Sequence, residues 1–285
     1  MRTCSRRIAL LGLGVGAIGS GLLARPAGAA PLAGVLARNE LKVAVYKEFA
    51  PWSYHEEGRL VGVDVDLGAL LAKSLGVSAS YLELPAGENL NDDLRNAVWR
   101  GSVLGSPVAD VMLHVPVDKG LAAQNDKTLI GAPYYRERFL LASTSDCSAG
   151  PAALDGLRVG VELDSAPDFF MLGAFGGKFR NNVVHFPDGA AAAAAMARGQ
   201  VQAVLATRAQ VQHGLRGYAG PVSYYTGVLP GLGRTSWPVG VAVRSDSDDL
   251  MQSLSTALAA AVGHGVVASV FQNHGVTYSE PELSS

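Results

Sequence analysis

The chain alternates short apolar segments with segments of helical periodicity over most of its length. Residues 41–46, LKVAVY, form an apolar run typical of a buried strand, and the leucines within residues 67–75 then recur at helical spacing. Asp64 is placed to cap that helix and Gly76 to end it. Alternation of this kind predicts repeated β–α units, whose strands pair in parallel with helices on both faces of the sheet.

The same pattern continues along the rest of the chain, where the strands and helices fall into two series. Further strands are expected at residues 79–84, 109–114, 157–161, 182–186, 201–206 and 239–244, and further helices at 91–99, 167–174, 189–198 and after Asp246. The stretches PYYRERFLLA and TSWPVGVAVR join the two series. We therefore expect an α/β fold of two lobes, each a mostly parallel sheet flanked by helices. The ligand cleft is expected between them, near the carboxyl ends of the strands.

The N-terminus has the pattern of a secretory signal peptide. Arg2, Arg6 and Arg7 precede an apolar, glycine-rich run at residues 8–23, and small residues follow. The run is short for a membrane anchor, which is the alternative interpretation. We expect residues 1–29 to be removed after Ala29, so that the mature chain is periplasmic and not inserted in the membrane. The export route, general secretory or twin-arginine, stays open.

Charge and cysteine content limit the partners of the mature chain. Loss of residues 1–29 leaves 19 basic and 25 acidic residues, a net charge of −6, which argues against a nucleic-acid partner. Cys4 is lost with the signal peptide, so Cys147 is left without an internal disulfide partner. It follows the first crossing in STSDCSAGP, where we expect an exposed thiol.

Several segments in order resemble the family 3 periplasmic solute-binding proteins. The opening LKVAVYKEFAPWSYHEEGRLVGVDVDLGALLAKSLGV is similar to that family's strand, aromatic turn and G-x-x-x-G-F-D-V-D-L helix. APYYRERFLLA resembles its crossing, and LDGLRVGVELDSAPDFF resembles its L-x-G-x-x-V-G-V-x-x-G-S-T segment. The resemblance implies two α/β lobes that close on a small ligand and work with the membrane permease of an ABC importer. Residues 32–138 and 237–285 would form lobe 1, and residues 139–236 lobe 2.

The two charge clamps of the family's amino-acid binders are missing from the matching positions. The arginine that holds the ligand carboxylate falls on Ala122 or its neighbour Leu121, and the aspartate that holds the ammonium falls on Thr207. Arg208, beside Thr207, recognises an anion only if it faces the cleft. Because a bidentate arginine is a strong carboxylate anchor, we expect a solute other than a standard α-amino acid.

The resemblance also places ligand contacts at the carboxyl ends of two strands of lobe 1. The hydroxyl residues that usually end the third strand become His114, Val115 and Val117. After the first strand come four aromatic residues. We expect Tyr46 and Trp52 to contact the ligand, and the other two, Phe49 and Tyr54, to pack in the core.

Each remaining candidate has a structural alternative. His114 is either a ligand or metal contact or a satisfied structural histidine, and Asp118 is expected to cap the next helix rather than to bind metal. Ser165, with Asp164, precedes a helix N-terminus that either binds an anion or is merely capped. The acidic segment at residues 87–93 is expected to be a surface loop. We predict no metal and no cofactor.

Catalysis is not expected, because G-x-S-x-G, H-E-x-x-H and P-loop motifs are all lacking in the sequence. His114 and Asp118 as an acid–base pair would be the basis of a dehydratase-type reaction, since a few proteins of this fold are dehydratases. A second alternative is an accessory partner of a periplasmic quinoprotein (pyrroloquinoline-quinone) alcohol dehydrogenase. DVMLHVPVD followed by PYY resembles the DVVxGVP and RPYY of such chains, although the opening segment does not.

Overall fold

A computed structural model describes residues 31–101, 105 and 107–281. The expected signal peptide lies outside the described residues. Within them, no single helix is long and apolar enough to cross a membrane. Two helices, α8 (Asp248–Gly263) and α9 (Val266–Asn273), pass that test only as a pair bent by 77°. Leu254, Leu258 and Phe271 of this pair are buried in the protein core.

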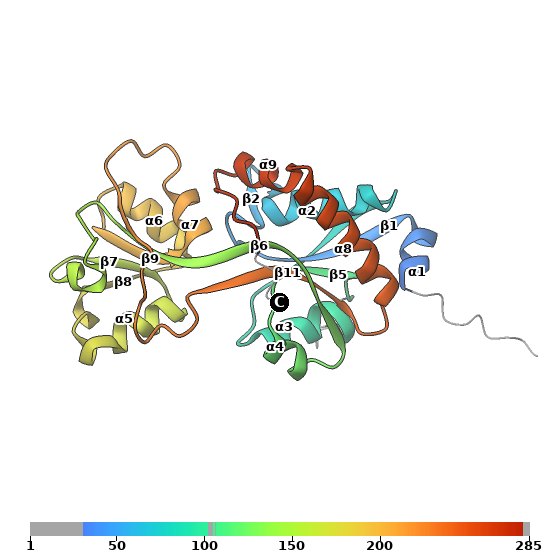
Figure 1. The fold of residues 1–285 in the computed structure, drawn as a ribbon, viewed down its shortest axis with the longest axis horizontal. Helices are drawn as coiled ribbons and strands as arrows, with labels where there is room; N and C mark the ends of the chain where they lie inside the picture. The colour runs from blue at the N-terminus through green and yellow to red at the C-terminus, as the bar shows by residue number, and fades with distance from the viewer. Residues whose placement is uncertain (1–30, 102–104, 106, 282–285) are drawn as a thin grey trace, which may run out of the picture.

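The strands form one continuous, mixed sheet that runs through two lobes (Figure 1). Its order is β4-β1-β5-β11-β6-β9-β7-β8, with β10 also paired to β6. The bounds are β1 Glu40–Tyr46, β4 Ser78–Leu84, β5 Val111–Pro116, β6 Thr128–Ser143, β7 Val159–Glu162, β8 Val183–Phe186, β9 Ala203–Thr207, β10 Ser223–Tyr225 and β11 Ser236–Arg244. A separate hairpin pairs β2 (Tyr54–Glu56) with β3 (Arg59–Val61). The parallel pairs β1–β4, β1–β5, β7–β8 and β7–β9 lie within the lobes, whereas β6 and β11 pair antiparallel with each other.

Helices cover both faces of the sheet in lobe 1, the part on the right of Figure 1. Val43 and Val45 of β1 face a core shared with α2 (Val63–Ser74), α8 and α9, whereas Ala44 between them faces a second core. That second core contains residues of α3 (Leu90–Leu94) and of a π-helical turn, η1 (Arg95–Trp99). Two shorter helices, α1 (Pro31–Arg38) and α4 (Lys119–Gln124), complete this lobe.

Lobe 2 repeats this layering with smaller side chains. One face of its strands packs on α5 (Ala166–Gly177), and the other packs on α6 (Gly189–Ala197) and α7 (Arg208–Gly214). Short 3-10 turns lie at Gly150–Leu154 and Arg180–Asn182. The α6 face is mostly alanine, so helix and sheet approach closely. The predicted two-lobe α/β class is therefore confirmed. The exact division at residues 138/139 and 236/237 falls within β6 and β11 and stays a prediction.

Local details of lobe 1 differ from the sequence-based expectations. Asp64 does not cap α2. The helix begins at Val63, two residues earlier than a cap at Asp64 would place it, and its N-cap is Gly62, at a φ of 137° that favours glycine. Asp64 therefore lies inside the first turn and is fully buried. Gly76, at φ 72°, follows the helix end as expected.

Two segments expected at the surface are partly or fully packed. The acidic stretch at residues 87–93 is not only a surface loop, because Asn89 caps α3 and the Asp93 side chain is buried. The predicted exposed thiol is wrong. Cys147 has no exposed surface, and its backbone N–H donates to Ser223 Oγ at 3.1 Å. Pairing of β10 with β6 brings Ser223 over the cysteine, a long-range contact that the loop sequence does not reveal.

Candidate functional site

A small pocket lies where the lobes meet, at the carboxyl ends of β7 and β9. Its volume is about 190 Å³. Lobe 2 supplies most of its wall, the crossing strands β6 and β11 supply two aromatic residues, and the loop after β1 supplies one from lobe 1. The lining residues are Phe49, Phe139, Glu162, Ser165, Ala166, Pro167, Leu205, Ala206, Thr207, Gln210 and Trp237. This is the position at which open α/β folds bind ligands.

Three aromatic side chains form the apolar part of the pocket. Phe139 of β6 and Trp237 of β11 meet edge to face, with ring centroids 5.0 Å apart. Phe49 approaches from lobe 1, where its ring also contacts the His114 ring at 5.0 Å. All three side chains are half-buried, so they present surface to a bound molecule.

The polar part of the pocket is a hydrogen-bonded chain that ends on a carboxylate. The Thr207 hydroxyl donates to Gln210 Oε1 at 2.9 Å, and Gln210 Nε2 donates to Glu162 Oε2 at 3.3 Å. Gly189 leaves room for this arrangement, since a Cβ there would meet Gln210 Oε1 at 2.5 Å. Burial raises the pKa of Glu162, against the lowering effect of the Gln210 hydrogen bond. Glu162 is the one charged residue among those that line the pocket in the described chain.

Ser165 and Thr207, both predicted ligand contacts, lie in this pocket, and each caps a helix. The Ser165 side chain accepts from Asp168 N at 3.2 Å and donates to the Glu162 backbone carbonyl at 2.6 Å. Thr207 accepts from Gln210 N as the N-cap of α7. The capping interpretation of Ser165 is therefore confirmed, and its role toward a ligand stays a prediction.

Arg208 is engaged with the crossing strand. Its Nη2 donates to the Tyr135 hydroxyl at 2.9 Å, and the guanidinium lies 5.5 Å from the Tyr135 ring centroid. Arg208 is not among the residues that line the pocket. These contacts hold the start of α7 against β6, so in this conformation the guanidinium is used within the protein.

His114 is turned into the core of lobe 1 by a β-bulge. Val115 pairs with Gly240 and Met112 with Ala242, so Leu113 and His114 together oppose one residue of β11. His114 adopts a left-handed φ of 60°. Its ring packs on Trp52 with centroids 4.2 Å apart, and its side chain is only 12% exposed. The ring packs as that of a structural histidine does, but its Nδ1 has no hydrogen-bond partner among the described residues, so the expected satisfied histidine is not found and a role toward a ligand stays a prediction.

A buried acid lies beside this histidine. Tyr134 donates to Asp64 Oδ1 at 2.8 Å, and His114 Nδ1 lies 3.6 Å from Asp64 Oδ2. Burial raises the pKa of Asp64 to about 8 and lowers the pKa of His114 to about 3. Both directions favour a protonated, neutral Asp64 beside a neutral His114, so lobe 1 contains no net charge here at neutral pH.

The other predicted contacts in lobe 1 lie away from the pocket. Trp52 and Val115 have no exposed surface in this conformation and belong to the two cores of the lobe, so their contact with a ligand stays a prediction. Tyr46 donates its hydroxyl to Asp93 Oδ2 at 2.8 Å, which holds α3 against β1. Val117 packs where Gly240 of β11 leaves space, and its N–H donates to Pro238 O. Neither Tyr46 nor Val117 lines the pocket.

Nine of the eleven lining residues are not among the contacts predicted from the sequence. They include Glu162 and Gln210, the crossing residues Phe139 and Trp237, and Phe49, which the sequence assigns to the core. One usable clue is present in the sequence: Glu162 directly follows the strand predicted at residues 157–161 and lies just before the helix cap predicted at Asp164 and Ser165. The aromatic residues carry no such clue, because their position depends on how the two crossings pair.

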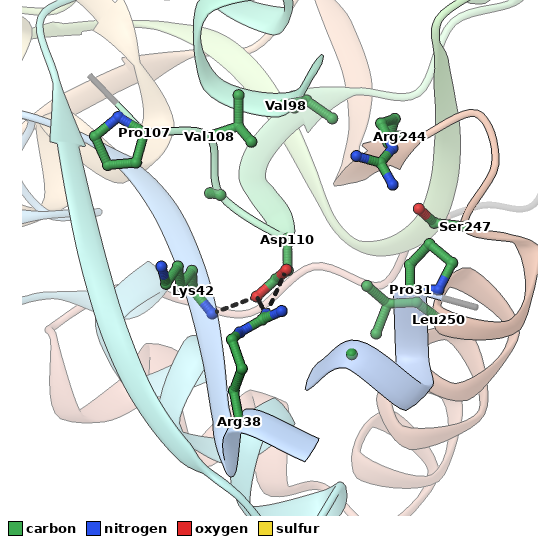
Figure 2. Close-up of a pocket in the computed structure, with 12 residues that line it drawn as sticks. Pro31, Arg38, Lys42, Val98, Pro107, Val108, Asp110, Arg244, Ser247 and Leu250 are labelled. Carbon is green, nitrogen blue, oxygen red and sulfur yellow. Dashed lines mark hydrogen bonds and ion pairs between the residues drawn. The ribbon is translucent and has the colours of Figure 1, made fainter. Parts of the chain in front are cut away.

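A larger hollow of about 500 Å³ lies elsewhere on lobe 1 (Figure 2). It lies at the amino ends of β1 and β5, where one guanidinium nitrogen of Arg38, Nη2, lies 2.8 and 2.7 Å from the two carboxylate oxygens of Asp110. The Lys42 backbone N–H also donates to Asp110. These charges already satisfy one another, and ligands of such folds bind at the opposite, carboxyl ends of the strands. We therefore place the candidate site at the smaller pocket. Within the described chain, no group of three or more histidine, cysteine or acidic residues is arranged to hold a metal ion.

Comparison with known proteins identifies a family segment in lobe 1. Residues 41–97 match the bacterial extracellular solute-binding proteins, family 3, which confirms the resemblance predicted from the sequence. The matched segment runs from β1 into η1 and includes Phe49. No curated protein matches the chain.

Solved structures with the same fold cover most of the chain. An ancestral cationic amino acid solute-binding protein aligns with a TM-score of 0.65 at 18% identity, over 86% of this chain and 99% of that one. An amino acid ABC transporter substrate-binding protein from Streptococcus pneumoniae bound to L-arginine gives 0.62 at 16% identity, over 88% and 99%. An ancestral amino-acid-binding protein described as a precursor of cyclohexadienyl dehydratase gives 0.57 at 17%, over 87% and 100%. At these identities the similarity establishes the two-lobe binding-protein fold.

Proposed function

We propose that this protein captures a small solute between its two lobes in the periplasm and delivers it to an ABC-type importer. The observation that carries the proposal is the pocket at the lobe junction, with Phe49 from lobe 1 opposite the polar residues of lobe 2. Closure of the lobes would bring both walls onto one molecule. The family match and the substrate-binding neighbours support the same function.

We further propose that the solute is not a standard α-amino acid. A bound α-carboxylate needs a cationic or multiple hydrogen-bonding partner, since an unpaired buried charge is costly. The lining residues supply no lysine, arginine or histidine in the described chain, and Arg208 is bonded to Tyr135. Losing one charged hydrogen bond weakens binding by about 1.5–3 kcal/mol. Binding of the zwitterion would therefore be poor.

Solute binding without catalysis is the function that the geometry favours. A reaction by His114 and Asp118 would need both groups free at the cleft. Asp118 instead caps α4 and accepts from Arg234 Nη2 at 2.6 Å, while His114 is packed against Trp52. The accessory role beside a quinoprotein dehydrogenase has no separate support in the geometry.

The test combines native mass spectrometry with solution scattering. The mature protein is purified without denaturation and any retained small molecule is identified. A retained solute should reduce the radius of gyration relative to the stripped protein, with no change in helix content by circular dichroism. Identical scattering curves for the two forms would overturn the binding-and-closure mechanism. A screen of the proteinogenic amino acids should give no melting shift, and a clear shift confirmed by calorimetry would reject the exclusion of amino acids.

A further inference from the structure

We propose that the solute is a small organic monocation without a carboxylate, an amine or quaternary ammonium, whose charge pairs with Glu162 and lies against the rings of Phe49, Phe139 and Trp237. The inference rests on the proposed binding function and names the chemical class of the solute.

The charge of the pocket is the first argument. Glu162 is the one ionisable group among the lining residues of the described chain, and its side-chain partner is the neutral amide of Gln210. Closing the lobes would remove water from this carboxylate, which is unfavourable unless a cation takes its place. A bound cation provides that partner, whereas a bound anion would be repelled by the same group.

The hydrogen-bond chain behind Glu162 is the second argument. Because Thr207 donates to Gln210 Oε1, the amide of Gln210 is oriented with its Nε2 toward Glu162. The carboxylate is thus positioned by a side chain of α7 and by the end of β7. Thr207, at the position that the resemblance assigns to the ammonium clamp, orients Gln210 in this chain. The negative charge belongs to Glu162, at the end of the neighbouring strand β7.

The apolar surface of the pocket is the third argument. An ammonium group is attracted to the faces of aromatic rings, and a desolvated site strengthens the effect. Besides the three aromatic residues, the wall contains alkyl surface from Ala166, Pro167, Leu205 and Ala206. This surface suits the carbon atoms of an alkylated amine and offers no charge to a carboxylate.

The size of the pocket limits the solute. A volume of about 190 Å³ is modest for a ligand site and favours a compact solute.

The experiment compares compounds matched in shape that differ in charge. Binding to the stripped mature protein is measured by calorimetry for choline, its neutral isostere 3,3-dimethylbutan-1-ol and the zwitterion glycine betaine, with ethanolamine and butylamine as primary amines. At least one amine should bind, and at least about tenfold more tightly than the neutral and zwitterionic compounds. If no amine binds at millimolar concentration, or if the neutral isostere binds as tightly, the inference is wrong.

Variants then test the role of Glu162. Glu162→Gln should weaken binding of the best amine by at least about tenfold, a loss of about 1.4 kcal/mol, and leave the neutral isostere unchanged. Glu162→Asp, which keeps the charge, should retain part of the affinity. Glu57→Gln removes one exposed carboxylate in the β2–β3 turn and serves as the matched control with no expected effect. Equal affinities in Glu162→Gln and the natural protein, with equal melting temperatures, would overturn the assignment.

Failure of this inference is distinguishable from failure of the proposed function. A retained neutral or anionic molecule that compacts the protein in scattering would reject the cation and leave solute binding intact. If neither a retained molecule nor any compound of the panel compacts the protein, the proposed function itself is rejected.

Discussion

The polar residues near the strand ends are buried in lobe 1 but line the pocket in lobe 2. In lobe 1, the His114 ring packs on Trp52, and the buried Asp64 accepts a hydrogen bond from the Tyr134 hydroxyl. In lobe 2, Glu162 and Thr207 face the pocket between the lobes. Both lobes are built from β–α units, so the layering is not the cause of the difference. A bulge in β5 turns the lobe 1 histidine inward, and β7, which pairs in regular register, has no equivalent.

This contrast separates a structural role from a recognition role. Burial favours the neutral form of both Asp64 and His114 in lobe 1, so neither presents charge to the cleft. Glu162 in lobe 2 has only neutral hydrogen-bond partners, which supports our proposal that recognition of charge belongs to lobe 2. Lobe 1 would contribute mainly the Phe49 ring.

The largest effect is expected for removal of the buried acid of lobe 1. Asp64→Ala leaves the Tyr134 hydroxyl without its acceptor and creates a small cavity, so the free energy of unfolding should fall by about 2–4 kcal/mol. Asp64→Asn keeps an acceptor oxygen and should cost less. Urea unfolding measures both. The matched change in lobe 2, Glu162→Gln, should cost less than about 1 kcal/mol. Equal losses in the two lobes would break the comparison.

The shifted pKa values of Asp64 and His114 should make the free energy of unfolding depend on pH. Between about pH 4 and 6.5 the folded state holds one proton, on Asp64, and the unfolded state also holds one, on His114. Because the two numbers are equal, this pair makes no contribution to the pH dependence of stability in that range. Above pH 6.5 unfolded His114 is also neutral, so only the raised pKa of Asp64 remains, and stability falls until about pH 8.

The expected loss between pH 6.5 and 8 is about 2 kcal/mol, at 1.36 kcal/mol per pH unit. It is measured as the difference between the natural protein and Asp64→Asn, which lacks the proton. Parallel stability curves for the two proteins over this range would contradict the raised pKa of Asp64.

A smaller effect is expected at the helix cap that borders the pocket. Ser165→Ala removes the N-cap of α5 and the hydrogen bond to Glu162 O, so the free energy of unfolding should fall by about 1 kcal/mol. Ser165→Thr keeps the hydroxyl and serves as the control. If alanine and threonine are equally stable in thermal unfolding, the hydroxyl does not cap the helix.

The smallest effect concerns Cys147 of lobe 2, whose thiol should hardly react with a maleimide while the protein is folded. Because the thiol has no exposed surface, a maleimide should react with the mature protein only after denaturant is added. The reaction is followed by intact mass. Complete labelling of the folded protein within minutes would show that β10 does not cover this site.

Most elements of the fold follow from local patterns in the sequence, but the members of the site do not. The strand LKVAVY, the helix over residues 67–75 and the caps Asp118 and Ser165 were predicted, because each depends on a few neighbouring residues. Ser165 and Thr207, expected at the cleft, line the candidate pocket, and their contact with a ligand stays a prediction. The sequence pattern placed His114 at the same kind of rim, since strict alternation along a strand has no means of indicating a bulge.

The sequence by itself therefore determined the β–α series and the two crossings. Only the tertiary structure decided that Phe49, Phe139 and Trp237 line one pocket with Glu162, and that Trp52, His114 and Cys147 lie inside. The physical reason is range. Helix periodicity and capping act over a few residues. The pairing of β6 with β11, and of β10 with β6, instead joins segments that are about 80 to 120 residues apart in the sequence.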